Sequence, residues 1–547
     1  MLQPTSQAKK REKGGPDTDP RAQEGGKATT LKPPKEVEAR YSELDYWKHY
    51  AERPFRSIVP SNYPVVCSLP INRPIWDDKI PDETLLGLLP APDVMDFDEF
   101  GPTVWGPEAY AKSFEKFFYA EPSDFFKLYP QECAFADKCF LKHFSFLQDS
   151  RVKHITATNK NLESTPAYPK MNEYATEEEF LEEHGWGPYV REFARIDHGA
   201  RPHVLWYLFM KKEVLKQAKI DDNDIRQILC ADPIYARIGA CFEQHQNDLM
   251  KKNTSKSSGQ CGWSPFDGGF SRTMDRLKRE GSYYVEFDWT RFDGTIPPKL
   301  FLHIKQLRWS FINQHQRERY RDMYKWYCYN LVHRYVLLPS GEVTKQDRGN
   351  PSGQISTTMD NNMVNYWLQA FEYAYFHGPD YDGWSKCDTI VYGDDRLSRV
   401  DKIPCNYVDR VCLMYKNVFG MWVKPEKVKV QRELPGLTFC GFEITPDYQP
   451  KPAQPYKLMA GLLKPACKLP DINALHGKLL SYQILTHFCD DDHPFKRYIE
   501  RCLSITAERA SSELPRRFTD EQLERLWRGG PRVFVLDNGQ AQASDET

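Results

Sequence analysis

The stretch Thr389-Ile-Val-Tyr-Gly-Asp-Asp-Arg-Leu397 decides the fold more than any other part of this chain. β-Prone residues lead into Gly393, two acids follow, and a second short apolar run comes next, which predicts strand, tight turn and strand. The turn presents Asp394 and Asp395 side by side. Adjacent carboxylates repel each other unless a cation neutralises them, and hard oxygen ligands suit Mg²⁺ or Mn²⁺.

A second acidic segment lies upstream, at Tyr283-Tyr-Val-Glu-Phe-Asp-Trp-Thr-Arg-Phe-Asp-Gly-Thr-Ile296. Residues 283–288 alternate between two faces, which predicts a strand that ends at Asp288. A carboxylate at the end of a strand can point into a cleft. Asp293 follows five residues later, beyond a turn.

A third segment, Gly349-Asn-Pro-Ser-Gly-Gln-Ile-Ser-Thr-Thr-Met-Asp-Asn-Asn362, begins as a loop and continues as a helix with a strongly apolar side. Thr357, Asn361 and Asn365 fall at i, i+4 and i+8, so they share a different face of that helix. A polar stripe on an otherwise apolar helix needs hydrogen-bonding partners, which a nucleotide could supply.

Taken in chain order, the three segments resemble motifs A (D-x4-D), B (SGxxxTxxxN) and C (GDD) of viral RNA-dependent RNA polymerases, and their residues are similar to those of the astrovirus branch. The resemblance implies a right-hand fold of the α/β (α+β) class, with fingers, an antiparallel-sheet palm and a helical thumb. It also implies RNA-directed RNA synthesis from NTPs, in replication and transcription of a positive-strand RNA genome. Three ordered motifs argue against three unrelated loops in another kind of globular enzyme.

Nucleotidyl transfer requires activation of a 3′-hydroxyl and neutralisation of the charge that builds on the phosphates, which two metal ions about 3.5–4 Å apart achieve. We expect Asp288 and Asp394 as the principal ligands of two Mg²⁺ ions, with Asp395 in support and Mn²⁺ as a substitute. Each acid alone would more often be a turn or capping residue, but the matched motifs favour the metal role.

Asp293 bears on the choice of sugar. Reverse transcriptases, which share the palm, carry at this position an aromatic ring that excludes a 2′-hydroxyl, whereas a carboxylate accepts a hydrogen bond from that hydroxyl. The alternative is that Asp293 only begins a turn with Gly294. The resemblance implies that Asp293 reads the ribose together with Ser352, Thr357 and Asn361, and that Gly353 of the same motif also belongs to the substrate-binding site.

The basic stretch Lys211–Lys219 and the following Asp224–Ile228 resemble motif F, the fingers segment over the incoming triphosphate. Lys212, Lys219 and Arg226 best match its basic positions, because Arg suits bidentate phosphate contact and Lys offers a point charge. A solvated amphipathic helix is the alternative for such a Lys/Glu mixture.

Two further segments resemble flanking parts of the family. Ser164-Thr-Pro-Ala-Tyr-Pro169 is similar to motif G, so Ser164 and Thr165 are candidate template contacts, although an ordinary Pro-rich turn is the alternative. Leu437–Gly441 lies where motif E, the primer grip, belongs, and we interpret it first as structural.

Trp422-Val-Lys-Pro-Glu-Lys-Val-Lys429 is similar to motif D, whose lysine is implied to protonate the leaving pyrophosphate. Lys427 matches best because it follows the Pro-acid pair. Lys424 and Lys429 are close alternatives, so the register stays open.

Composition bounds the remaining possibilities. The chain has 547 residues, which favours several lobes, and its net charge of only −2 means that any RNA-binding cations must be concentrated locally. No apolar run is long enough to span a bilayer, and the N-terminus lacks a signal peptide's apolar core. The 14 cysteines form no CxxC pair, which predicts reduced thiols in a cytosolic protein. Neither Cys133/Cys139 nor Cys405/Cys412 has a matching second pair for a structural zinc site.

Composition and motif order also predict an organisation along the chain. Strands are expected near 283–288, 335–345, 389–400 and 437–444, and Thr519 is expected to cap a last helix. The predicted regions are a disordered tail at 1–40, mainly fingers and N-terminal extension at 41–282, a palm with an inserted fingers segment at 283–445, a helical thumb at 446–537, and a frayed tail at 538–547.

The resemblance further implies RNA template and product, NTPs and a viral replication complex as partners, with a genome-linked viral protein as a candidate primer. It implies the host cytoplasm as location, at replication complexes on host membranes, and origin as the end of a frameshifted polyprotein. A reverse transcriptase is the enzymatic alternative, which Asp293 disfavours. A non-catalytic RNA-binding protein is the other, which the intact acids disfavour, since a binding module has no need for converging carboxylates.

Overall fold

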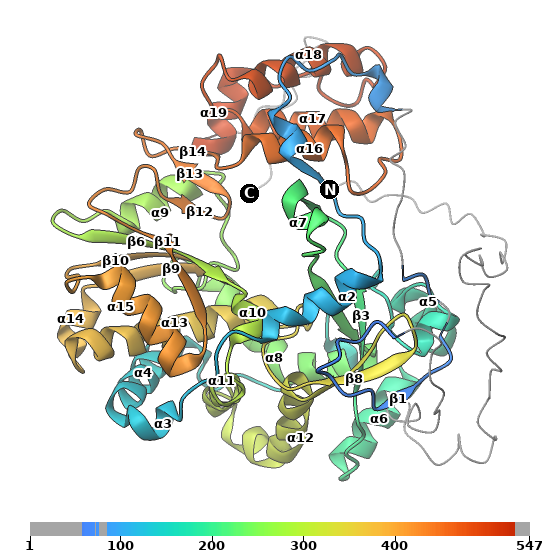
Figure 1. Ribbon diagram of the computed structural model, residues 1–547, viewed down its shortest axis with the longest axis vertical. Coiled ribbons are helices and arrows are strands. Elements are labelled where there is room, and N and C mark those ends of the chain that lie inside the picture. Colours follow the sequence, from blue (N-terminus) through green and yellow to red (C-terminus); the bar gives the residue numbers. More distant parts are fainter. Residues whose placement is uncertain (1–56, 72, 76–84, 531–547) are drawn as a thin grey trace.

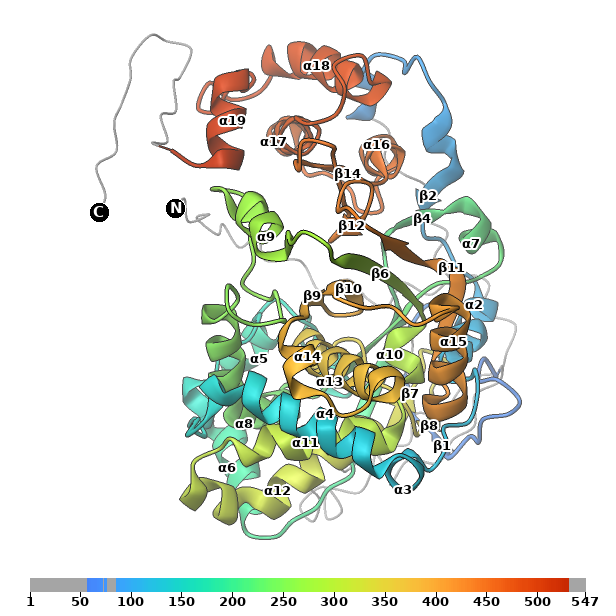
Figure 2. The same ribbon diagram turned by 90° about the vertical axis from the view of Figure 1, so that its left-hand side faces the viewer.

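The computed structural model of the protein describes residues 57–71, 73–75 and 85–530. Their arrangement is a right hand: a thumb of helices lies above the palm sheet, and the fingers lie beside it (Figures 1 and 2). The tails predicted at 1–40 and 538–547 fall outside the described residues. The mixed α/β class and the hand-like fold expected from the motifs are therefore confirmed, whereas the boundaries between regions stay predictions.

The palm is a four-stranded antiparallel sheet in the order β11-β6-β10-β9. Its strands are β6 (Tyr283–Thr290), β9 (Asp388–Tyr392), β10 (Asp395–Val400) and β11 (Trp422–Gln431). In the β9–β10 hairpin Asp395 is paired with Tyr392, so Gly393 and Asp394 form the turn, as predicted. Strand β11 was not predicted, whereas each of the four regions in which strands were expected contains a strand.

Strand β6 places its two faces in different surroundings. Val285, Phe287 and Trp289 pack into the main core. On the opposite face Glu286 is buried and accepts hydrogen bonds from the backbone N and hydroxyl of Thr438, at 2.9 and 2.6 Å. Asp288, on that same face, is exposed. The strand runs on to Thr290, so Asp288 does not end it as expected, because burial of Trp289 continues the alternation.

Helices cover the underside of the palm sheet. Helix α13 (Thr357–His377) is buried along most of its length and lies between the sheet and α4 (Pro130–His143). Its Glu372 pairs with Arg396 of β10 at 3.1 Å in the core. Helix α15 (Tyr407–Met414) lies between β10 and β11 in the chain and continues into a π-helical turn at Tyr415–Phe419.

Four buried charges join three helices beneath the motif B loop. Lys305 and Arg308 of α11 (Pro298–Ser310) contact Glu243 of α8 (Pro233–Lys252) and Asp360 of α13. The Lys305 ammonium lies 2.8 Å from Glu243 and 2.6 Å from Asp360, and its side chain is only 1% exposed. Burial alone would lower the pKa of Lys305, but Asp360 and Glu243 raise it, so the lysine is held in its charged form.

The fingers contain a five-stranded sheet in the order β1-β8-β7-β3-β5. Strand β3 is an almost continuous buried apolar run, so its sequence lacks the alternation by which a strand is recognised. The strands are β1 (Cys67–Ser68), β3 (Leu205–Met210), β5 (Gln227–Ala231), β7 (Arg334–Leu337) and β8 (Glu342–Gln346), and a smaller pair joins β2 (Phe100–Pro102) to β4 (Val214–Lys216).

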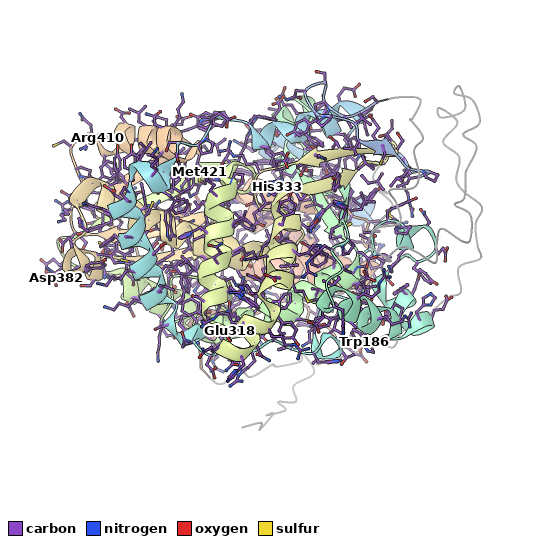
Figure 3. All side chains as sticks on the ribbon, turned by 90° about the horizontal axis from the view of Figure 1, so that it is seen from below. Trp186, Glu318, His333, Asp382, Arg410 and Met421 are labelled. Carbon is purple, nitrogen blue, oxygen red and sulfur yellow. The ribbon has the colours of Figure 1, made fainter. Side chains whose placement is uncertain are left out.

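The remaining helices outside the thumb surround these sheets. Figure 3 shows the underside, where α12 runs from near Glu318 to His333 just past its end. They are α2 (Pro107–Ser113), α3 (Phe125–Leu128), α5 (Glu177–His184), α6 (Gly187–Asp197), α7 (Gln217–Asp221), α9 (Gly269–Leu277), α10 (Phe292–Thr295), α12 (Gln314–Val332) and α14 (Tyr381–Ser385).

The thumb packs around its own apolar core, to which Phe97 and Phe100 from the N-terminal part of the chain contribute. The hydroxyl of Tyr498 also donates to the carbonyl of Pro90 at 2.7 Å, so this early segment ties the fingers side to the thumb. Thr519 caps α19 in a capping box, as predicted. The thumb elements are α16 (Pro455–Leu463), α17 (Ile472–Leu485), α18 (Pro494–Ala507) and α19 (Asp520–Arg528), next to the small sheet of β12 (Thr438–Phe439), β13 (Phe442–Ile444) and β14 (Pro450–Pro452).

The cysteines agree with a reduced protein. All 14 are free thiols, and Cys133 and Cys139 are buried in α4. Across the described ranges no helix combines the length and apolar character needed to cross a bilayer.

Replacing Lys305 by Met should lower the free energy of unfolding by about 3 kcal/mol, because a broken buried pair leaves carboxylates without their partner. Lys299, on the same helix, lies 3.3 Å from Asp124 and is 68% exposed, so Lys299→Met should change stability by less than about 1 kcal/mol. Urea unfolding of both variants measures the difference. Equal losses would show that the buried cluster does not stabilise the palm more than a surface pair does.

Candidate active site

A cavity of about 620 Å³ lies between the palm sheet and the thumb. The palm contributes acids to it, and the thumb contributes polar side chains from the opposite side. Its lining includes Glu286, Asp288, Asp394, Asp395, Thr438, Gln454, Lys457 and Tyr482. The structure thus brings the three acids predicted as metal ligands to one cavity, from β6 and from the β9–β10 hairpin.

Asp288 faces this cavity from β6 and makes an ion pair with Lys427 of β11 at 3.0 Å. The register between β11 and β6 shifts between Val423 and Val428, and this irregularity carries Lys427. The Lys427 side chain is 49% exposed and that of Asp288 is 60% exposed, so water reaches both groups. Of the three candidate lysines Lys427 is the one that contacts a predicted metal ligand, whereas Lys424 lies 5.0 Å over the Trp422 ring.

Asp394 and Asp395 occupy a site that holds protons more tightly than ordinary carboxylates do. The Asp394 side chain reaches solvent in the cavity, but the surrounding protein limits its hydration, which raises its pKa to about 6 with further contributions from Asp293 and Asp288. Burial raises the pKa of Asp395 to about 7, although its carboxylate accepts a hydrogen bond from the backbone N of Cys440 at 2.7 Å. Like charges in limited water account for both shifts.

Two amides of α13 hold the turn that carries these acids. The side-chain oxygen of Asn362 accepts from the backbone N of Gly393 at 2.6 Å, and the amide of Asn365 donates to the carbonyl of Gly393 at 3.3 Å. Gly393 has φ +65°, which favours glycine. Asn362 was missed as a site residue, and the polar stripe that includes Asn365 finds a protein partner here.

A second polar cluster surrounds Asp293 on α10. Its carboxylate accepts from the hydroxyl of Ser352 at 2.9 Å and from the amide of Asn361 at 2.7 Å. Three of the predicted sugar-reading residues therefore meet. Thr357 does not join them, because its hydroxyl bonds the carbonyls of Pro351 and Gln354, at 3.1 and 2.9 Å.

Gly353 has a steric role in the motif B loop. Its φ is +115°, and a Cβ added there would lie 2.2 Å from the carbonyl oxygen of Leu229. The neighbouring carbonyl of Ser352 accepts from the backbone N of Leu229 at 2.8 Å. The absence of a side chain at Gly353 therefore lets the loop lie directly against β5, where the hydrogen bond to Leu229 holds the backbone of Ser352.

The predicted basic segment lies across the fingers, where it forms β4 and α7 and not one amphipathic helix. Arg226 pairs with Glu213 through two hydrogen bonds, and its side chain is 61% exposed. Lys212 and Lys219 are exposed on the same segment. The segment also lies near the thumb residue Lys457. Burial lowers the pKa of Lys457, Glu213 opposes this shift, and the positive charges of Arg226 and Lys219 add to it.

One cation near the site has no motif to signal it. Lys116, in the short turn η5 (Phe114–Phe117), packs its backbone carbonyl against Gly294, where a Cβ would lie 2.3 Å from that oxygen. Burial lowers the pKa of Lys116 to about 8, against the opposing effect of Asp293. It comes from a segment far from every recognised motif, so only the fold brings it to the cluster.

Ser164 and Thr165 line a separate cavity of about 510 Å³, together with Gly353, Ile355 and Lys251. The hydroxyl of Ser164 donates to the carbonyl of Asn161 at 2.7 Å and accepts from Lys160. The segment resembling motif G thus lies across a cavity from the motif B loop.

The donor set around the first cavity fits a divalent cation, because it brings the carboxylate oxygens of Asp288, Asp394 and Asp395 together. Burial, with a further contribution from neighbouring acids, raises the pKa values of Asp394 and Asp395, and a bound cation would offset this. In the parts of the chain that the structure describes, no three His, Cys, Asp or Glu side chains are already arranged to enclose an ion. Asp288 accepts from Lys427 and Asp395 from the backbone N of Cys440, each through one carboxylate oxygen, so a cation shared with Asp394 would compete with these two donors.

Sequence comparison with known proteins shows which family the chain matches. A sequence model described as viral RNA-dependent RNA polymerase matches residues 103–494. The chain is 60% identical over 512 residues to the non-structural polyprotein 1AB of Human astrovirus-8, covering 93% of the chain and 36% of that polyprotein. It is 53% identical over 505 residues to the corresponding polyprotein of Mink astrovirus 1 (89% and 36% covered) and 46% identical over 440 residues to that of Turkey astrovirus 1 (78% and 27% covered). The chain thus spans about a third of the length of these relatives.

Divalent-ion binding at this site should weaken as the pH falls from 8 to 6. Protons bound to Asp394 and Asp395, with pKa values of about 6 and 7, must leave before the carboxylates can ligate, so Mn²⁺ affinity should fall about tenfold over this range. Ordinary carboxylates, with a pKa near 4, would show no such loss. Calorimetric Mn²⁺ titration at the two pH values measures it.

The folding stability of the metal-free protein should depend on pH in the opposite direction, and fall as the pH rises. Because both pKa values are raised by folding, the native state binds protons more tightly than the unfolded state, and these two groups lower stability as pH rises from about 5 to 8. Equal Mn²⁺ affinities at pH 6 and 8 would contradict the assignment of these two acids as ligands.

Proposed function

Because the chain belongs to the viral RNA-dependent RNA polymerase family, we propose that it catalyses template-directed transfer of nucleoside monophosphates from NTPs to an RNA 3′ end, releasing pyrophosphate. Its task would be replication and transcription of a positive-strand RNA genome. The observation that carries the proposal is the convergence of Asp288, Asp394 and Asp395 on one cavity from separate strands of an antiparallel palm.

Asp288 and Asp394 are the proposed principal ligands of two Mg²⁺ ions, with Asp395 in support and Mn²⁺ as a substitute. When bound, such ions would lower the pKa of the attacking 3′-hydroxyl and neutralise charge on the phosphates. The 3.0 Å pair between Lys427 and Asp288 gives the site a cation that can be exchanged for a metal ion. Once released from Asp288, Lys427 would lie beside the cavity as the proton donor to the leaving pyrophosphate.

The cluster around Asp293 is the proposed sugar reader. Ser352 and Asn361 already donate to its two carboxylate oxygens, at 2.9 and 2.7 Å, so the cluster is built for hydroxyl recognition. Gly353 would contribute by letting the loop approach β5. For Thr357 the hydrogen bonds to loop carbonyls favour an indirect contribution to NTP binding, through the shape of the motif B loop.

Lys212, Lys219 and Arg226 are the proposed contacts of the incoming triphosphate. Their exposure allows this, and Glu213 holds the Arg226 guanidinium in a fixed, bidentate arrangement until a phosphate competes for it. Ser164 and Thr165 are the proposed template contacts, supported by their place on a cavity opposite the motif B loop.

The two alternative functions make different demands on the site. A reverse transcriptase would need a side chain at Asp293 that excludes a 2′-hydroxyl, whereas this carboxylate accepts two hydrogen bonds. A non-catalytic RNA-binding protein would gain nothing from acids with raised pKa values next to an RNA phosphate backbone.

The family also suggests partners beyond RNA and NTPs. We propose that the enzyme works in a viral replication complex in the host cytoplasm, associated with host membranes through other components, and that a genome-linked viral protein serves as primer. Expression by ribosomal frameshifting is a further proposal for a chain similar to polyprotein 1AB. Primer-dependence assays with and without the candidate protein primer would test the initiation mode.

Replacing Asp394 by Asn should reduce primer extension in Mg²⁺ by about a hundredfold or more, because charge stabilisation of the transition state is lost. The melting temperature should hold or rise, since one of several crowded negative charges is removed. The matched control is Asp382→Asn, on α14 at the edge of the molecule in Figure 3, which should extend primers like the parent protein. Parental turnover of Asp394→Asn in Mg²⁺ would refute the metal assignment.

The parent enzyme should prefer ATP to dATP, and either Asp293→Ala or Asn361→Ala should narrow that preference. Losing a hydrogen bond to a buried partner costs about 1–3 kcal/mol, which corresponds to roughly ten- to a hundredfold in selectivity. Asp293→Ala should also slow the reaction, because the sugar pocket positions the α-phosphate. The quantity to measure is the ratio of kcat/KM for ATP and dATP on one template. An unchanged ratio in both variants would place discrimination elsewhere.

A further inference from the structure

A chain of buried hydrogen bonds leads from the four-charge cluster into the motif B loop. Asp360 accepts from Arg308 at 2.8 Å through one oxygen, and from Lys305 and Gln354 at 2.6 and 2.7 Å through the other. Because an ionised carboxylate only accepts hydrogen bonds, Gln354 must turn its NH₂ group toward Asp360. Its carbonyl then faces the backbone N of Ser356, which donates to it at 2.8 Å.

The direction set at Gln354 passes to two asparagines. The same NH₂ group of Gln354 donates to the side-chain carbonyl of Asn350 at 3.0 Å, so the NH₂ group of Asn350 faces away and donates to the carbonyl of Asn361 at 2.9 Å. That leaves the NH₂ group of Asn361 to donate to Asp293 at 2.7 Å. Every amide in the chain has one orientation only, because carboxylates stand at both ends.

Burial makes this chain rigid. Asn350 and Asp360 are 0% exposed, Asn361 is 4% exposed and Gln354 is 8% exposed, so water cannot substitute for a lost partner. The backbone of Asn350 is fixed as well, since its N donates to the carbonyl of Asp293 at 2.8 Å.

We propose that Asn350, oriented by Gln354 and Asp360, is a positioning residue for sugar selection. It keeps the amide of Asn361 turned with its NH₂ group toward Asp293, and so presets the donor pattern that an incoming ribose meets. This inference rests on the proposed function of Asp293 and Asn361 in reading the sugar. Neither Asn350 nor Gln354 was predicted as a site residue, although both lie in the quoted motif B stretch.

Asn350→Asp is the sharpest test, because it keeps the shape of the side chain and reverses what it offers to Asn361. A carboxylate at position 350 can only accept, so it would draw the NH₂ group of Asn361 toward itself and turn the carbonyl of Asn361 toward Asp293. The sugar reader would then lose its donor without losing any residue that is proposed to contact the nucleotide.

The experiment measures the kcat/KM ratio for ATP and dATP on one primer–template in the parent protein, Asn350→Asp and Asn350→Ala, alongside melting temperatures. The matched control is Asn330→Asp, which reverses a buried amide that donates to the carbonyl of Trp326 at 2.9 Å on α12. We expect the ATP preference to fall about tenfold in Asn350→Asp and less in Asn350→Ala. Asn330→Asp should lose stability and keep the parental ratio.

The outcomes separate the inference from the function on which it rests. A parent protein that extends no primer with any nucleotide would refute the proposed function itself. An active parent whose ATP preference survives in both Asn350 variants would overturn the positioning role alone. If Asn350→Asp folds but does not turn over, the ratio of equilibrium affinities for ATP and dATP in the primer–template complex replaces the kinetic ratio. If Asn350→Asp does not fold, Asn350→Ala decides by the same measurements.

Discussion

The buried cluster of Lys305, Arg308, Glu243 and Asp360 is the interaction on which the arrangement of this palm depends. It fastens α8, α11 and α13 to one another where no water is available to solvate a lone charge. A purely apolar core could hold three helices together equally well, since burying ions costs much of what their attraction returns. What charges add is direction: Asp360 accepts only, and this dictates the orientation of every polar group bonded to it. Through Gln354, this constraint sets the orientation of the side-chain amides of Asn350 and Asn361.

Above this scaffold the fold concentrates negative charge. Limited hydration, together with the nearby carboxylates of Asp293 and Asp288, raises the pKa of Asp394, which shows that its negative charge is unfavourable in the protein alone. Three features of the metal-free protein offset this unfavourable charge. Lys427 pairs with Asp288, and hydrogen-bond donors contact Asp395 and Asp293. The raised pKa values of Asp394 and Asp395 also favour proton binding. A cation or a substrate hydroxyl could replace each of these interactions, so the same acidic groups are suited to binding.

Much of this was accessible from the chain itself, because the information is local. A strand, a glycine turn and two acids specify the β9–β10 hairpin within nine residues, and the alternation of residues 283–288 predicted the strand that carries Asp288. The predicted meeting of Asp293, Ser352 and Asn361 came from the family resemblance, and the structure brings them within hydrogen-bonding distance. Strands β3 and β11 escaped prediction, since one is apolar without alternation and the other is interrupted by an irregular register.

By itself the sequence determined the family, the class of fold and the acids of the candidate site, because the spacing and order of motifs can be read directly along the chain. Only the tertiary structure decided which partner each polar group takes. Thr357 lies on the predicted face yet bonds its own loop, and Asn362 holds the Gly393 turn. Lys116 packs against Gly294, the residue after Asp293, from a segment with no motif at all. The physical reason is that a hydrogen bond is made with whatever donor or acceptor packing brings within about 3 Å, and packing joins residues that the sequence keeps far apart.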